Sequence, residues 1–284
     1  MQKRILSAFS IALASLAPVA GHASDGTLEI SQACVATGCF PGDAAGFPVT
    51  IAQSGSYRLT SNLTPTTAQV GIDVTADDVA IDLGGFAVKS TNACSGPPDA
   101  DTTCAVNAPT ADGIHSSAAR TRVRSGAVVG MGGTGIELGV QAEVEDVSVA
   151  ENGDKGIQIT SGRVSGCSAF ENYYTGIYVM LGPGLVERST ASRNGYTGVL
   201  ATNAVIAHSQ SGENRGAGIV AQGVGSLADG NVVYNNVGYG ITAGAEDGYT
   251  HNVINGNHGG NAYTQLPAGT NLGGNVCGND AVCP

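Results

Sequence analysis

Three side chains with acid–base chemistry occupy equivalent positions in successive segments of the chain. Asp73, His115 and Glu137 each come two residues after a glycine. On neighbouring strands, such side chains would follow one another about every 4.8 Å, which is close enough for joint proton transfer or for holding a metal ion. The spacing makes these three residues candidate catalytic groups. The alternative is that they are ordinary outward-facing residues on a solvated surface.

Tyrosines and one lysine cluster in the following segments of the chain. They are Tyr173, Tyr174, Tyr178, Tyr196 and Lys155. A tyrosine ring offers an apolar face that can stack on the C–H face of a sugar, and a hydroxyl group that can stay in water. We expect these five residues to bind substrate. Strand surfaces also favour tyrosine for packing alone, so a purely structural role is the alternative.

These candidates belong to a stretch that repeats every 20–22 residues. An asparagine opens each unit, a glycine follows four residues later in the first five copies, and an Ile or Val comes next. The asparagines are Asn152, Asn172, Asn194, Asn214, Asn236 and Asn257. A unit of this length is too short for two helices and a turn, but it fits one coil of a solenoid.

The composition of the units favours strands over helices. Apolar side chains alternate with others, as in Ile177-Tyr178-Val179, which is the periodicity of a strand with one buried face. Asparagines in register would stack from coil to coil and hydrogen-bond to the next turn. We therefore predict an all-β solenoid in which each coil contributes three short parallel strands.

The segment Asn172-Tyr173-Tyr174-Thr175-Gly176-Ile177-Tyr178-Val179 resembles a repeat of the right-handed parallel β-helix family. The resemblance covers most of residues 70–265. It implies a single-stranded right-handed parallel β-helix of about eight coils, with pectate-lyase-like architecture and disulfide-containing end caps. Many members of this family cleave or epimerise acidic polysaccharides. This chain has neither tryptophan, which pectate lyase signatures contain, nor the Asp-Pro-rich motif of mannuronan epimerases.

The sequence divides into four parts. Residues 1–23 have the basic start, the apolar stretch and the small-residue end of a bacterial signal peptide. We expect an amino-terminal cap at 24–66, the β-helix at 67–265 and a carboxy-terminal cap at 266–284. A loop at 90–110 interrupts the period of the helix. Because it leads into the strand that carries His115, we expect it to overhang His115 and Glu137.

Six of the seven cysteines come in near pairs. In an exported protein these pairs predict three local disulfides. The pairs are Cys34 with Cys39, Cys94 with Cys104, and Cys277 with Cys283. Cys167 is left over, in a column of small residues, and is expected to be a buried structural thiol.

The net charge of −11 limits the kinds of partner that we expect the protein to bind. An acidic surface argues against nucleic acid, and against tight binding of polyanionic sugars unless calcium or a local basic patch intervenes. No segment after the signal peptide is apolar enough for a membrane span. We expect a secreted or periplasmic protein. The sequence carries no indication of an oligomeric state.

Two functions fit these expectations. In the first, one lateral face of the β-helix binds a polysaccharide or cell-surface glycan and the protein cleaves or modifies it. His115 would then abstract a proton, assisted by Glu137 or Asp73. No cofactor or metal site is expected, apart from calcium if the reaction is that of a lyase. In the second, the protein is a non-enzymatic extracellular or periplasmic scaffold or adhesin that uses the same flank for contacts.

Overall fold

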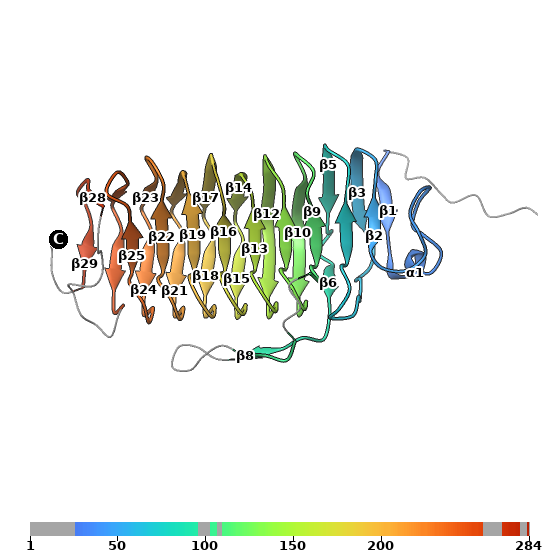
Figure 1. The fold of residues 1–284 in the computed structure, drawn as a ribbon, viewed down its shortest axis with the longest axis horizontal. Coiled ribbons are helices and arrows are strands. Elements are labelled where there is room, and N and C mark those ends of the chain that lie inside the picture. The colour runs from blue at the N-terminus through green and yellow to red at the C-terminus, as the bar shows by residue number, and fades with distance from the viewer. Residues whose placement is uncertain (1–25, 96–102, 107–109, 258–268, 279–282, 284) are drawn as a thin grey trace, which may run out of the picture.

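The chain forms one long stack of strands (Figure 1). The computed structural model describes residues 26–95, 103–106, 110–257, 269–278 and 283. The predicted signal peptide lies outside these residues, as do parts of the predicted inserted loop and of the carboxy-terminal cap. Strand pairing along the stack is parallel, which confirms the predicted all-β parallel solenoid.

One wall of the solenoid is a sheet of nine parallel strands. Its strands are β2 (Val49–Ile51), β4 (Ile72–Val74), β9 (Ile114–Ser116), β11 (Ile136–Leu138), β13 (Ile157–Ile159), β16 (Ile177–Val179), β19 (Val199–Thr202), β22 (Ile219–Gln222) and β25 (Ile241–Ala243). Each begins with a buried Ile or Val, because β-branched side chains pack well on a half-buried strand. The second residue of each strand belongs to the outward column. Eight of these strands follow a turn glycine, and β2 adds a ninth from the segment expected to form the amino-terminal cap.

The other two walls belong to one eighteen-stranded sheet. The long strands β10 (Arg122–Val129) and β12 (Ala142–Ala150) run through both walls and join them. The first of these walls also contains β1 (Leu28–Ile30), β3 (Gly55–Leu59), β5 (Val79–Asp82), β14 (Gly162–Ser165), β17 (Gly184–Glu187), β20 (Ala204–Ala207), β23 (Leu227–Asp229), β26 (Gly248–Thr250) and β28 (Thr270–Asn271). The second contains β6 (Ala87–Lys89), β15 (Ser168–Phe170), β18 (Thr190–Ser192), β21 (Gln210–Gly212), β24 (Val232–Tyr234), β27 (Val253–Asn255) and β29 (Val276–Cys277).

The repeated asparagines form a ladder inside the solenoid. From Asn152 to Asn257, each side-chain Nδ2 donates to Oδ1 of the asparagine on the next coil at 2.8–3.0 Å. The same Oδ1 atoms accept from the backbone N–H of the preceding asparagine. These side chains are at most 1% exposed, so the hydrogen bonds satisfy polar groups that water does not reach. The predicted ladder is confirmed.

A second ladder, not predicted from the sequence, runs along the column of Cys167. The backbone N–H of Cys167 donates to the Ser189 hydroxyl, and that of Ser189 donates to the Ser209 hydroxyl. The column continues through Asn231, whose Nδ2 donates to Asn252 Oδ1 at 3.0 Å. Cys167 is therefore a buried member of a structural column, and burial raises the pKa of its thiol to about 11. The second ladder could have been predicted from Asn231 and Asn252, because each lies five residues before an asparagine of the first ladder.

Disulfides close both ends of the described stack. Cys34–Cys39 joins the short helix α1 (Gln32–Val35) to the turn that follows it, and Cys277–Cys283 joins β29 to residue 283. The third expected disulfide, Cys94–Cys104, links β7 (Cys94–Ser95) and β8 (Thr103–Cys104), which pair as an antiparallel hairpin. The expected disulfides are thus present, and two of them lie at the ends of the solenoid.

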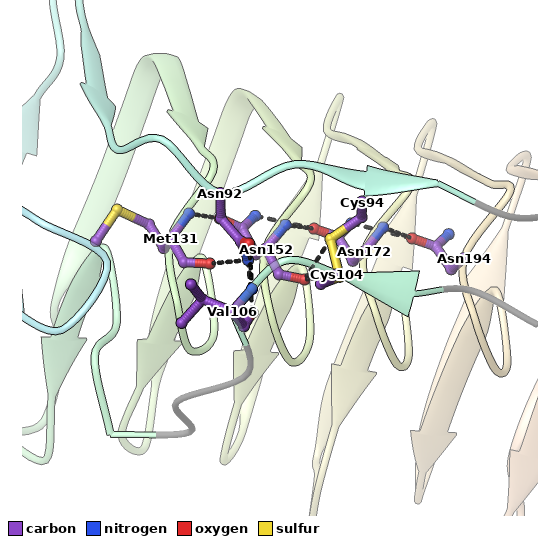
Figure 2. The surroundings of a disulfide bond; sticks show 8 residues. All are labelled: Asn92, Cys94, Cys104, Val106, Met131, Asn152, Asn172 and Asn194. Atoms are coloured by element: carbon purple, nitrogen blue, oxygen red, sulfur yellow. Dashed lines mark hydrogen bonds between the residues drawn. A yellow bond between two sulfur atoms is a disulfide. The ribbon is translucent and has the colours of Figure 1, made fainter.

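The hairpin β7–β8 lies over the asparagine turns (Figure 2). The sulfur atoms of Cys94 and Cys104 are 3.6 and 3.8 Å from the carbonyl oxygen of Asn152. Asn92 holds the base of the hairpin in place. The Asn92 Nδ2 donates to the carbonyl oxygens of Val106 and Met131, and the Asn92 Oδ1 accepts from the N–H of Val106. Expecting the whole inserted loop to overhang His115 and Glu137 was therefore wrong for the hairpin, because these contacts direct it onto later coils.

Charges on the first wall of the large sheet alternate between coils. Arg122 lies 3.2 Å from Glu143, and Arg163 bridges Glu143 and Glu187. Arg163 lowers the pKa of the Glu187 carboxyl by hydrogen bonding to it. Exposed pairs of this kind each contribute no more than about 1 kcal/mol, so they support the register of the strands rather than drive folding.

Candidate functional site

The three predicted acid–base residues lie side by side on the outer face of the nine-stranded sheet. Asp73 pairs with His115 in the strand register, and His115 pairs with Glu137. His115 Nδ1 is 2.8 Å from Asp73 Oδ1. On the next coil, Gln158 Nε2 donates to Glu137 Oε1 at 2.7 Å. The structure therefore brings Asp73, His115 and Glu137 together, with both carboxylates held by hydrogen bonds.

These residues line a pocket of about 590 Å³. Its walls come partly from two short segments ahead of the repeats, represented by Phe47, Pro48 and Gln69. Of the predicted 90–110 loop, Thr110 is the lining residue within the described part of the chain. The Phe47 and Pro48 side of the pocket was not predicted from the sequence, because it depends on β2, which pairs with β4 and brings this segment to the face.

A fourth ionisable residue in the pocket, Asp112, was not predicted. It is 4% exposed, and its Oδ1 accepts a hydrogen bond from the Thr134 N–H at 2.8 Å. Its Oδ2 has no hydrogen-bond partner among the described residues. Burial raises the pKa of Asp112 to about 7, and the negative charge of Glu137 contributes in the same direction. Its place directly before the turn glycine Gly113 was the only sequence signal.

The other predicted residues form a second cluster further along the same wall. Tyr174 and Tyr196 stack with their ring centroids 4.6 Å apart and their planes 3° from parallel. Lys155 Nζ lies 5.9 Å from the centre of the Tyr174 ring and 2.8 Å from Asp154 Oδ2. The two rings are 40% and 46% exposed, so the stack is accessible from solvent. The lysine, in contrast, is mostly covered and already paired.

Two further tyrosines connect or flank these clusters. Tyr178 stands in the outward column of Glu137 and Gln158, one coil beyond Gln158. Tyr173 is exposed on the turn beside Tyr174. The predicted residues thus fall into an acid–base pocket and a tyrosine cluster on one flank, joined by the column that runs from Asp73 to Tyr178.

Another depression, of about 430 Å³, lies on the first wall of the large sheet. Its charged residues include Arg122 and Arg124, which pair with Glu143 and Asp82 at 3.2 and 3.0 Å. The charges of these four side chains therefore balance one another.

Neither a metal cluster nor a membrane-spanning helix is found in the described part of the chain. No group of three or more His, Cys, Asp or Glu side chains there is arranged to hold a metal ion. No helix among the same residues is long and apolar enough to cross a membrane.

The fold and the lateral site define a parallel β-solenoid protein. The chain belongs to the family described as "Right handed beta helix region", whose profile matches residues 112–265, more than half of its length. A comparison with curated proteins found no match.

Two solved structures show the same fold at low sequence identity. The A-module of mannuronan C-5 epimerase AlgE4 from Azotobacter vinelandii has a TM-score of 0.51 and 13% identity, over 85% of this chain and 70% of that one. The Dettilon tailspike protein gp208 has a TM-score of 0.51 and 14% identity, over 88% of this chain and 58% of that one. At this identity the likeness establishes the architecture alone.

Proposed function

We propose that this is an exported β-helix protein that binds a polysaccharide along the outer face of the nine-stranded sheet and modifies it in the pocket at His115. The observation that carries the proposal is the shared flank of the two clusters. One outward column contains Asp73, His115, Glu137 and Tyr178, and the Tyr174–Tyr196 stack stands on the turns beside it. A linear polymer laid along the solenoid axis would contact both.

The tyrosine stack supports the binding half of this proposal. Tyr174 and Tyr196 hold each other in fixed orientations, so a ligand loses less free energy in ordering them than it would with isolated side chains. Their apolar faces and hydroxyl groups suit a partner that has both C–H and O–H groups on its surface, as a sugar does.

The pocket supports the modification half. Asp73 orients the His115 ring through Nδ1, which leaves Nε2 as the nitrogen available to a bound molecule. Glu137 is fixed by Gln158 in the same pocket. The pocket thus combines a positioned imidazole with carboxyl groups, which are the kinds of side chain that bind sugar hydroxyls and transfer protons.

Two other findings support the assignment to exported, polysaccharide-related proteins. One structural neighbour is a mannuronan C-5 epimerase by name, and its enzyme class suggests a polysaccharide for this chain as well. The three disulfides fit an oxidising compartment, as does the predicted signal peptide, so we place the protein outside the cell or in the periplasm.

A glycan array tests the binding site. The wild-type protein should retain at least one polysaccharide, and the double variant Tyr174→Ala/Tyr196→Ala should bind it at least about tenfold more weakly. Phe170→Ala is the matched control, because Phe170 is similarly exposed at 37% but lies on β15 of the large sheet. Equal loss in both variants, or no glycan retained by the wild type, would refute the proposed face.

Product formation distinguishes the enzyme from the scaffold. Incubation of a retained polysaccharide with the wild-type protein should change its chain length or its sugar composition, and His115→Ala should abolish that change. Binding without any such change, unaffected by His115→Ala, would instead indicate a non-enzymatic scaffold or adhesin.

A further inference from the structure

The pocket at His115 has an unusual charge for a site that would accept an acidic sugar. Its lining includes the carboxyl groups of Asp73, Asp112 and Glu137, and neither Arg nor Lys is present among its described lining residues. The cation of the adjoining tyrosine cluster, Lys155, is paired with Asp154 at 2.8 Å. A bound anion would therefore face carboxyl groups without an Arg or Lys side chain to pair with among the described lining residues.

Charge of this sign selects against uronate polymers. A uronic acid residue carries one carboxylate, and its approach to ionised carboxylates in a partly enclosed pocket is electrostatically unfavourable. A neutral sugar avoids this repulsion, and a protonated amino sugar would be attracted. The acidic net charge of the whole chain, −11, acts in the same direction on a polymer that approaches from solution.

Two of the carboxyl groups in the pocket differ in burial and in hydrogen bonding. Asp112 lines the pocket and is buried, its Oδ1 accepts one hydrogen bond from a backbone N–H, and its Oδ2 has no hydrogen-bond partner among the described residues. Glu137 is less buried, and its Oε1 accepts a hydrogen bond from Gln158 Nε2. Glycoside hydrolysis uses two carboxyl groups, one that donates a proton and one that accepts a proton, and a buried and a more exposed carboxyl group in one pocket suit these two roles.

We propose, resting on the function proposed above, that this pocket hydrolyses a glycosidic bond in a neutral or amino-sugar polymer, with Asp112 as the proton donor and Glu137 as the base. Asp112 Oδ2 gives its proton to the oxygen of the leaving sugar as the bond from that oxygen to the anomeric carbon breaks. Glu137 takes a proton from a water molecule as the water oxygen forms the new bond to the same carbon. Proton transfer between the two carboxyl groups through solvent restores the starting state.

In this reaction His115 and Asp73 transfer no proton, and their positions suit them to hold the sugar in place. The two side chains form a hydrogen-bonded pair on the coils next to Glu137, and they line the same pocket. In this role His115 Nε2 binds a sugar hydroxyl and so positions the ring, and Asp73 holds the imidazole in place.

The test compares polymers of different charge at about 0.15 M salt, where non-specific attraction is screened beyond roughly 8 Å. Dextran and a mixed-linkage glucan serve as neutral probes, chitosan as the amino-sugar probe, and alginate and polygalacturonate as uronate probes. The readouts are binding, new reducing ends, and ultraviolet absorbance from unsaturated uronate. We expect new reducing ends from at least one neutral or amino-sugar polymer. Asp112→Asn and Glu137→Gln should each reduce this rate by at least about 100-fold while binding is retained.

Glu246→Gln, which changes an exposed carboxylate away from the pocket, should keep the wild-type rate. If Asp112→Asn does not fold, the wild-type protein in heavy-oxygen water gives an independent test, because hydrolysis must place one solvent oxygen at the new reducing end. Unsaturated product, epimerised uronate without new ends, or full activity in Asp112→Asn would overturn the hydrolytic mechanism. Calcium-dependent turnover of the uronate polymers alone would overturn the substrate class. In each of these cases glycan binding by the tyrosine face would still stand, whereas failure to bind any polymer would refute both proposals.

Discussion

His115 Nδ1 lies 2.8 Å from Asp73 Oδ1, although 42 residues separate the two in the sequence. The inserted loop accounts for that separation, since Asp73 and His115 occupy the same position on directly paired strands. The contact fixes one ring nitrogen against a carboxylate and leaves the other, Nε2, available to the pocket.

Removing the charge of Asp73 should impair turnover more than binding. In Asp73→Asn the imidazole loses its charged acceptor and adopts more orientations, so kcat should fall while KM changes little. His115→Ala, which removes the ring that positions the sugar, should cost about 100-fold in kcat or more. The matched control is Asp229→Asn, because Asp229 pairs with His251 at 3.3 Å on another wall of the solenoid. An equal effect of both Asp→Asn substitutions on kcat would contradict a role for the Asp73–His115 pair.

The asparagine ladder should be most sensitive near its centre. Asn194→Ala removes the Oδ1 that accepts from Asn172 and the Nδ2 that donates to Asn214 and to the Ala169 carbonyl oxygen. Buried groups left without partners should lower the free energy of unfolding by on the order of 3 kcal/mol, and Tm by roughly 5–10 °C. Thermal unfolding followed by circular dichroism measures this. Asn255→Ala, an exposed asparagine on β27, should leave Tm within about 2 °C; a comparable fall there would argue against the ladder as the cause.

Asp112 should make stability depend on pH. Its pKa is about 7 in the folded protein, against 3.8 ordinarily, because burial disfavours the charged form; nearby Glu137 and Asp154 add to the effect and His115 opposes it. Between about pH 4 and 7 the folded state therefore binds the extra proton, so this contribution to stability is present at low pH and is lost as pH rises. It amounts to on the order of 4 kcal/mol.

Urea unfolding at pH 5 and pH 8 checks this dependence. Asp112→Asn should reduce the difference between the two pH values, because the amide cannot ionise. Glu246→Gln should retain the wild-type difference. If Asp112→Asn and the wild-type protein show the same change in stability with pH, the raised pKa of Asp112 is not the cause.

Replacing Asn92 should loosen the inserted hairpin without unfolding the solenoid. Asn92→Ala removes three hydrogen bonds that hold the hairpin base, including the one that the Val106 N–H donates to Asn92 Oδ1 at 2.7 Å (Figure 2). Hydrogen exchange at Val106 should then accelerate, while amides near Asn194 keep their protection, because the hairpin is not part of a coil. Unchanged exchange at Val106, or loss of protection along the whole ladder, would contradict this view.

The repeat predicted the wall of the site because a solenoid converts sequence period into spatial alignment. With one coil per 20–22 residues, the outward residue after each turn glycine had to fall in one column, and Asp73, His115 and Glu137 do. The inward asparagines followed from the same register. A strict period leaves the chain few alternative pairings, since a shift of one residue would turn the apolar face toward water.

The segments of the chain that lie outside the repeats could not be placed from the sequence in this way. The hairpin's position depends on the amide of Asn92 and on a disulfide lying over a backbone carbonyl, and neither contact has a repeating signal. The pocket wall depends on β2, which pairs with β4 although its sequence lacks the preceding glycine.

The sequence by itself determined the architecture, the asparagine ladder and the alignment of the candidate side chains, because each of these follows from a short repeated pattern. Only the tertiary structure decided that Asp112 is a pocket residue and that Tyr174 and Tyr196 stack. Ionisation and stacking depend on how deeply a side chain is buried and on which neighbours it meets. Those conditions arise where loops, turns and adjacent coils pack together, and the repeat does not encode them.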